Sequence, residues 1–398
     1  MLIKDIGLLV GIVPQGVLRK EGADQNETGM IRNAWLQCED GRIAAFGPMT
    51  DCPSGYEGET LDAEGGMLMP GFCDSHTHVV FAGRRDGEFL DKINGLSYEE
   101  IAARGGGILN SADLLHRTPE EELYRESLPR VEEMLEKGTV ALEIKSGYGL
   151  NPEDELKMLR VIRRIGQTVP AAVRSTFLGA HAVGRGYTRE EYVQAVIGML
   201  PEAAALADFV DVFCDEGFFT VDDTARILEA ARGLLTPKIH ANELAVSGGV
   251  QVGVRFGALS VDHLERTGPE EIEALRGSAT MPTMLPGSSF FLGLPYGKAR
   301  EFLQAGLGVA LASDYNPGSS PSGDMRFVMA LGCIRMRLTP VEAFNAVTLN
   351  SAYAMGLSRE YGSVTVGKRA GLILSQPGWD LTQMAYQYQT PFIRRIFR

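Results

Sequence analysis

Two histidines separated by one residue, His76 and His78, are the first residues whose types and spacing could do chemistry. On an extended segment such residues point to the same side, so both imidazoles can bind one ion. Alone the pair is weak evidence, because solvated or core histidines give the same pattern. His240 and Asp314 each end a short apolar segment, and three imidazoles with one carboxylate suit Zn²⁺ or iron. We therefore predict that these four residues bind a single metal ion, Zn²⁺ or iron as Fe²⁺ or Fe³⁺.

Two more residues near these segments could move protons. Glu243 follows His240 by three residues, where its carboxylate could take a proton from a water activated by the metal. His263 stands at the next strand end and could polarise a reacting carbonyl group. Alone, Glu243 could be a solvated helix-start residue and His263 a core histidine, but beside four metal ligands we predict catalytic roles.

Lys145 raises the alternative of a two-metal site bridged by a carboxylated lysine. Lys145, His181, His240 and Asp314 follow the chain order of such sites. The bridging lysine belongs on the fourth barrel strand, however, whereas strand counting places Lys145 on the second. We therefore expect one metal.

Short apolar strands alternate with helices that begin with acidic residues from about Met67 onward, which favours a parallel sheet covered by helices. Eight such strands predict a (β/α)8 TIM barrel whose active site lies at the carboxyl ends of the strands. This closure places the ends of strands one, five and eight, which carry the predicted ligands, around a common mouth. The predicted strands cover 67–73, 140–145, 173–178, 209–213, 238–240, 259–262, 280–285 and 309–312.

Helix starts are predicted from capping boxes, in which a hydroxyl residue precedes an acidic residue by three positions. The predicted pairs are Ser97 with Glu100, Thr118 with Glu121, Thr188 with Glu191, and Thr339 with Glu342.

Glycine- and proline-broken short strands occupy both ends of the chain. We predict one small β-sandwich domain built from residues 1–66 and 362–398, with the barrel spanning 67–361.

The formal net charge of -13 argues against a nucleic-acid partner, because a polyanion would be repelled. An anionic small-molecule substrate would need a local cation.

The cysteines number five and none form a C-x-x-C pair, which argues against a disulfide framework and fits a reducing cytoplasm. The apolar run at 8–13 is too short for a membrane span and lacks a signal-peptide cleavage site, so we expect no membrane association.

Long motifs along the whole chain resemble the imidazolonepropionase family within the amidohydrolase superfamily. They are DSHTHVVFAGRR at 74–85, GGGI at 105–108, KSGYGL at 145–150, LGAHA at 178–182 and SDYNPGS at 313–319.

The resemblance implies a cytoplasmic enzyme of histidine degradation that hydrolyses the ring C–N bond of 4-imidazolone-5-propanoate, giving N-formimino-L-glutamate. It assigns the metal to the same four ligands. It makes Glu243 the general base and proton shuttle and has His263 assist the carbonyl group, while Asp314 could also take part in proton transfer. It places the propionate and the ring among seven substrate-binding residues, Arg85, Tyr98, Tyr148, His181, Asn316, Gly318 and Ser319. Arg85 would supply the cation that an anionic substrate needs. Because such barrels are usually dimers, we expect a homodimer.

Two segments depart from the family pattern, namely 183–187 and Ala370-Gly371, and they affect loop shape rather than chemistry. The glycine run at 105–107 could let backbone approach a ligand, although a plain tight turn would explain it nearly as well.

A mononuclear deaminase of the same superfamily, acting on a nucleobase-like ring, would carry an identical metal, Glu and His set. A non-catalytic binding barrel is the alternative from another class, but such relatives usually lose metal ligands.

Overall fold

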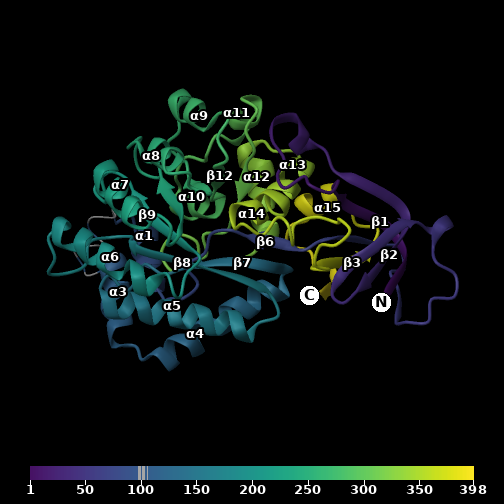
Figure 1. Cartoon of the computed structure of the whole chain (residues 1–398), viewed down its shortest axis with the longest axis horizontal. Helices are drawn as coiled ribbons and strands as arrows, with labels where there is room; N and C mark the ends of the chain where they lie inside the picture. Colours follow the sequence, from purple (N-terminus) through teal and green to yellow (C-terminus); the bar gives the residue numbers. More distant parts are fainter. Residues whose placement is uncertain (97–99, 101–103, 105) are drawn as a thin grey trace.

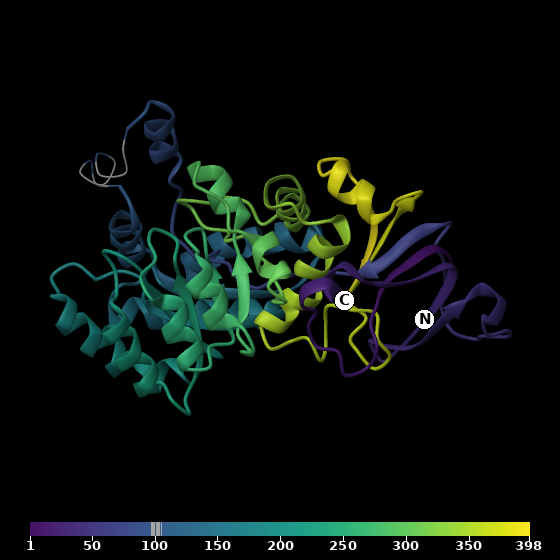
Figure 2. The same cartoon turned by 90° about the horizontal axis from the view of Figure 1, so that it is seen from above.

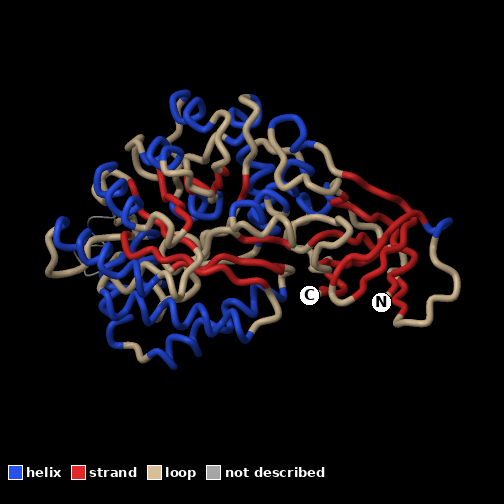
Figure 3. Tube along the Cα trace, viewed as in Figure 1, coloured by secondary structure: helices blue, strands red, loops and turns tan. Residues whose placement is uncertain are grey.

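A computed structural model describes residues 1–96, 100, 104 and 106–398 of the chain. Its strands form two separate sheets, a parallel eight-stranded sheet and a mixed seven-stranded sheet (Figures 1 and 3). The parallel sheet runs in the spatial order β13-β12-β11-β10-β9-β8-β7-β6, so each strand lies beside its sequence neighbour. The predicted barrel is confirmed. Its strands are β6 (Phe72–Asp74), β7 (Thr139–Lys145), β8 (Ala172–Ala180), β9 (Phe209–Cys214), β10 (Thr236–Ala241), β11 (Ser260–His263), β12 (Met281–Met284) and β13 (Ala310–Leu311).

The predicted first strand, 67–73, is wrong as a single element, because the chain changes sheets at Gly71. Residues before it form β5 (Gly66–Pro70), which pairs with the smaller sheet, and β6 begins immediately after it. A Cβ at Gly71 would lie 2.8 Å from Cγ2 of Val140, so this close crossing requires glycine. Apolar character runs through both segments, which is why the sequence suggested one strand.

Helices cover the outside of the barrel and bury their apolar stripes against it (Figure 3). In α5, for example, Met158, Val161, Ile162 and Ile165 are all fully buried, following the helical repeat. The barrel helices are α1 (Asp86–Ile93), α3 (Ile108–Arg117), α4 (Glu120–Glu136), α5 (Pro152–Thr168), α6 (Arg189–Ala203), α7 (Val221–Ala230), α8 (Gly249–Arg255), α9 (Pro269–Leu275), α10 (Pro286–Leu292), α11 (Ala299–Gln304), α12 (Met325–Met336), α13 (Pro340–Ala346) and α14 (Leu349–Ala354).

Two of the predicted capping boxes are confirmed, at Thr188 for α6 and at Thr339 for α13. At Thr118 a helix does begin where predicted, since α4 starts at Glu120, but the capping box is wrong: Thr118 ends α3 and its hydroxyl donates to the carbonyl oxygen of Leu114 at 2.9 Å. The prediction at Ser97 lies outside the described residues.

The smaller sheet is built from both ends of the chain, as predicted. Figures 1 and 2 show the carboxyl-terminal strands beside the amino-terminal ones, at the end of the molecule opposite α6 and α7. Ile3, Ile6 and Leu9 of β1 form its core together with Leu372 and Leu374 of β14. Its strands are β1 (Leu2–Ile12), β2 (Gly29–Glu39), β3 (Arg42–Pro48), β4 (Thr60–Asp62), β5, β14 (Leu372–Pro377) and β15 (Ile393–Phe397), accompanied by η1 (Gly22–Asn26), η2 (Met49–Asp51) and α15 (Leu381–Tyr386).

The seam between the first and last barrel strands is closed just beyond the strand ends. The backbone N–H of Asp314 donates to the carbonyl oxygen of His76 at 3.0 Å, and that of His78 donates to the carbonyl oxygen of Tyr315 at 2.9 Å. The Asp74 carboxylate accepts both the backbone N–H of Ser313 at 3.0 Å and its hydroxyl at 2.5 Å. Barrel closure and the predicted metal ligands therefore share the same short segments.

Within the described residues, no helix combines the length and the apolar character needed to cross a bilayer.

Because fully buried Asp74 accepts two of the seam hydrogen bonds, we expect its substitutions to lower stability by different amounts. Asp74→Ala leaves the Ser313 N–H and hydroxyl without acceptors and should lower the free energy of unfolding by about 2–3 kcal/mol. Asp74→Asn keeps one acceptor and should cost less. Urea unfolding of the two variants checks this, and an equal loss would contradict the seam bonds as its cause.

Candidate metal centre and active site

Three imidazoles and one carboxylate converge at the carboxyl ends of the barrel strands. Nε2 of His78 lies 3.1 Å from Nε2 of His76 and 3.4 Å from Nε2 of His240. Oδ1 of Asp314 lies 3.6 Å from Nε2 of both His76 and His78. All four side chains are almost completely buried. The residues predicted as ligands from sequence are therefore brought together.

The other ring nitrogens fix which atom of each imidazole is free to bind. Nδ1 of His76 lies 2.7 Å from Asp262 Oδ2, and Nδ1 of His240 lies 2.9 Å from Asp211 Oδ2. Asp262 accepts the Nδ1 proton of His76, and the Asp211 carboxylate beside Nδ1 of His240 favours a proton there, which leaves the Nε2 lone pairs of these two rings free. Burial, together with the nearby ammonium of Lys145, holds the pKa of His76 well below its usual value. Neutral imidazoles with converging lone pairs are a donor set that fits a cation.

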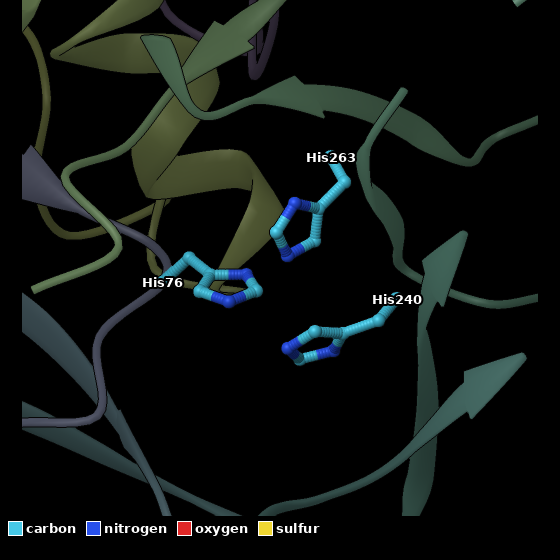
Figure 4. Close-up of side chains that lie close together, drawn as sticks. All are labelled: His76, His240 and His263. Carbon is cyan, nitrogen blue, oxygen red and sulfur yellow. The ribbon is translucent and has the colours of Figure 1, made fainter. Parts of the chain in front are cut away.

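His263 also lies in this group, and Figure 4 shows its ring pointing toward those of His76 and His240. Its two nitrogens face carboxylates, however: Nε2 is 3.6 Å from Glu243 and Nδ1 is 3.5 Å from Glu265. Burial disfavours a charged ring, but Glu243 and Glu265 outweigh burial and raise the pKa of His263 well above its usual value. A doubly protonated imidazolium ring has no lone pair for a metal.

A cluster of five buried charges lies directly behind the histidines, with every side chain inaccessible to solvent. Lys145 Nζ lies 2.5 Å from Glu143 and 2.7 Å from Asp211, and it is 3.6 Å from Asp262. Lys238 contacts Glu143 and lies 3.8 Å from Asp262. Each carboxylate that orients an imidazole is thus held in turn by an ammonium group, which offsets the cost of burying it.

This pairing also bears on the two-metal alternative. Lys145 ends β7, the second barrel strand, and three carboxylates surround its ammonium group. These carboxylates raise the pKa of Lys145 above its usual value despite its burial. A charged lysine cannot be carboxylated, so the geometry favours the one-metal expectation.

A cavity of about 880 Å³ lies over the imidazoles and is lined by most of the predicted site residues. His76 lies beneath it, and Tyr98 lies outside the described residues. The predicted residues that line the cavity are His78, Arg85, Tyr148, His181, His240, Glu243, His263, Asp314, Asn316, Gly318 and Ser319.

Tyr148 and His181 form one wall of this cavity. The His181 ring stacks on His78 with centroids 5.2 Å apart, and its Nδ1 donates to the carbonyl oxygen of Gly147 at 3.0 Å. Nε2 of His181 is thereby left as an acceptor. The loop that carries Tyr148 is fixed by buried Glu155 of α5, which accepts the backbone N–H groups of Gly147, Gly149 and Leu150.

Glu243 belongs to a loop that is held in a similar way. Asp215, just after β9, accepts the backbone N–H groups of Glu243 at 2.8 Å and Leu244 at 2.9 Å, and it also binds Ser247. This loop brings the Glu243 carboxylate into the cavity beside His263. Burial raises the pKa of Glu243 to about 7, although the neighbouring His263 lowers it.

Four non-glycine residues at these strand ends have left-handed backbone conformations: Asn242 (φ 59°), His263 (φ 86°), Leu264 (φ 68°) and Asp314 (φ 53°). Such conformations cost about 1 kcal/mol or more each and persist where neighbouring bonds impose them. Here the carbonyl oxygen of Asn242 accepts the N–H of Arg266 at 2.8 Å, and Asp314 is held by the seam bond. Of these residues, His263 and Asp314 line the cavity.

Arg85 immediately precedes α1 and packs against Gly318 of the last loop. A Cβ at Gly318 would lie 2.8 Å from Cζ of Arg85, so a larger residue would displace the guanidinium. Arg85 also forms a 2.5 Å ion pair with Glu88.

The amide of Asn316 is used within its own loop. Its Nδ2 donates to the carbonyl oxygen of Asp314 and to the hydroxyl of Ser319, while its Oδ1 accepts from the backbone N–H groups of Gly318 and Ser319. In this structure Asn316 therefore shapes the loop.

Sequence reasoning missed the residues that support the site. The signal was present for the charge cluster, because a charge inside an otherwise apolar parallel strand has to be paired. No local sequence pattern pointed to Glu265 beside His263, or to Asp215 and Glu155, which hold the loops of Glu243 and Tyr148. The missed residues are Glu143, Asp211, Lys238, Asp262, Glu265, Asp215 and Glu155.

The fold is that of an amidohydrolase, and the amidohydrolase family model matches residues 220–393. Among solved structures, a 5-methylcytosine deaminase from Klebsiella pneumoniae superposes with a TM-score of 0.74, over 98% of this chain and 96% of that one. Its identity is 15%, so this likeness shows the fold alone.

Full-length sequence relatives are more specific. An imidazolonepropionase from Flavobacterium johnsoniae is 50% identical, over 99% of this chain and 98% of the relative. One from Rubrobacter xylanophilus is 43% identical, over 95% and 93%. The chain belongs to the imidazolonepropionase family.

Because Lys238 belongs to the buried charge cluster and Lys298 does not, we expect their substitutions to change the free energy of unfolding by very different amounts. Lys238→Met would leave Glu143 and Asp262 with one cation fewer and should cost about 3–5 kcal/mol of unfolding free energy. Lys298→Met is the matched control, because Lys298 is half exposed and forms only a 3.6 Å pair with Glu301. It should change stability by less than about 0.5 kcal/mol. Urea midpoints of the metal-free proteins measure both, and similar midpoints would refute the cluster's role.

Proposed function

We propose that the chain hydrolyses 4-imidazolone-5-propanoate to N-formimino-L-glutamate, a step of histidine degradation. The observation that carries this proposal is the cavity itself, in which a metal-type donor set, a carboxylate of raised pKa and an arginine meet. Membership of the imidazolonepropionase family supports the choice of substrate.

His76, His78, His240 and Asp314 would hold one metal ion, Zn²⁺ or iron. Nitrogen and carboxylate donors suit both metals, so the ligands do not select between them. A metal ion held there lowers the pKa of water toward ~7 and polarises a carbonyl oxygen. Asp262 and Asp211 position two of the imidazoles for this purpose.

Glu243 is the general base and proton shuttle. Its carboxylate takes a proton from the attacking water as the oxygen adds to the ring carbonyl carbon. It then delivers that proton to the departing ring nitrogen, so the C–N bond breaks without releasing a nitrogen anion. The water thus supplies both the oxygen of the new carboxylate and the proton on nitrogen.

His263 stabilises the charge that develops on the carbonyl oxygen. With Glu265 on one nitrogen, the protonated ring can donate from the other nitrogen to the substrate oxygen. Asp314 can share the proton traffic in addition to its role as a ligand.

The remaining cavity residues bind the substrate. Arg85 pairs with the propionate, because a guanidinium can form two parallel hydrogen bonds with a carboxylate. Tyr148 and His181 form a wall against the flat ring, and Tyr98, which lies outside the described residues, is proposed as a further contact. The last loop contributes Asn316, Gly318 and Ser319.

We also propose that the protein works in the cytoplasm as a homodimer that binds no nucleic acid, in keeping with its acidity and scattered cysteines. Size-exclusion chromatography with light scattering tests the dimer, and a monomeric mass at micromolar concentration would refute it.

Loss of imidazolone absorbance by the purified protein, before and after chelation, tests the reaction directly. Glu243→Gln should keep its metal content and lose at least about a thousandfold in kcat, because the proton shuttle is gone. Glu216→Gln, at an exposed neighbouring carboxylate, is the control and should turn over normally. Ammonia release from nucleobases without imidazolone turnover would instead identify a deaminase.

Burial raises the pKa of Glu243 to about 7, and only its ionised form accepts a proton. The rate should therefore fall as pH drops through that pKa and level off above it. A bound dication favours the carboxylate, so the acid limb of kcat/KM should lie at or below about pH 7. The pH profile measures this, and activity that increases toward pH 5 would contradict the assignment.

A further inference from the structure

A second cation besides Arg85 lines the 880 Å³ cavity, namely Lys92 in the last turn of α1. Both side chains meet at Gly318. The guanidinium of Arg85 packs against the Cα of Gly318, and Nζ of Lys92 donates to its carbonyl oxygen at 3.0 Å. The positive groups of Arg85, just before α1, and of Lys92, within α1, therefore contact the same residue of the loop that begins at Asp314.

The two cations differ in how they are neutralised. Arg85 is paired with Glu88 at 2.5 Å, and the two side chains are only 12% and 11% exposed. Glu88 is held in place from the other side, since its second oxygen accepts the backbone N–H of Gly107 at 3.0 Å. Arg85 is thus already supplied with a carboxylate before any substrate binds.

Lys92 has no such partner within the described part of the chain, where it forms no ion pair. Its bond to Gly318 uses one of three N–H donors. Burial and the nearby positive charge of Arg85 lower the pKa of Lys92, although the Glu88 carboxylate acts in the opposite direction. A half-buried ammonium group that forms no direct ion pair with the described residues is a group that an anionic ligand would stabilise.

We propose that Lys92 is a specificity-determining residue that provides the second cation for the substrate carboxylate. The inference rests on the proposed function for the identity of the ligand. Arg85, shared with Glu88, positions the carboxylate, and Lys92 supplies the net positive charge that favours an anionic over a neutral side chain. Because Lys92 also ties α1 to the last loop, a purely structural role is the competing explanation.

The experiment compares a charged probe with a neutral probe of the same shape. Imidazole-4-propanoate and imidazole-4-propanamide are titrated calorimetrically into the metal-loaded protein. Lys92→Gln and Lys92→Met should weaken propanoate binding at least tenfold, about 1.4 kcal/mol, and change propanamide binding by less than about twofold. Lys92→Arg should restore most of the propanoate affinity, and Arg85→Ala gives the positive comparison.

Arg84→Gln is the matched charge control. Arg84 lines only the neighbouring cavity of about 540 Å³, so removing its charge tests whether general positive potential explains the effect. Its loss should leave the affinity of both probes within about twofold.

Equal weakening of both probes in the Lys92 variants would show a structural tether and overturn the proposal, as would unchanged propanoate binding. Melting temperatures of all variants show whether a loss of affinity follows from unfolding, and Lys92→Arg keeps the test valid if the neutral variants are unstable. Failure of the unmodified chain to hydrolyse the imidazolone would refute the proposed reaction alone, because charge-selective probe binding does not depend on turnover.

Discussion

The pairing of five charges inside the closed barrel is the constraint on which the site depends. Asp262 and Asp211 orient His76 and His240, and neither carboxylate could remain ionised there without the ammonium groups of Lys145 and Lys238. Charges buried at this depth are costly singly and tolerable only as a set. The imidazole geometry is therefore not a local property of the His-x-His segment but a consequence of strands β7, β9, β10 and β11 lying in register.

Barrel closure and the proposed metal site depend on the same residues. The seam between β6 and β13 is closed by backbone bonds of His76, His78 and Asp314, the residues whose side chains converge. A barrel that failed to close would also separate these donors. Strained backbone at His263 and Asp314 persists at the same rim, where the surrounding bonds impose it. Stability of the seam and preorganisation of the site thus depend on the same few hydrogen bonds.

The barrel and the convergence of the donor residues could be predicted from sequence because both follow from periodicity and from polar residues at strand ends. The strand break at Gly71 could not, since apolar residues continue across it and only the close approach of Val140 reveals the crossing. Glu265 was missed because its role is to face His263, a tertiary contact without a sequence signature. Lys238 and Asp211 were predictable in principle, as charges inside buried strands, but their mutual pairing required the register.

Substrate choice has to reside outside the metal site. A deaminase that is 15% identical shares the fold, so the barrel by itself does not define the ring that is opened. In this chain α1 contacts the loop after β13, where Arg85 and Lys92 meet Gly318. In a protein of net charge -13, two cations facing one cavity concentrate the attraction for an anion at the only place where it is useful. On the proposed function, chemistry would depend on the barrel rim, and substrate recognition would depend on α1 and the loop after β13.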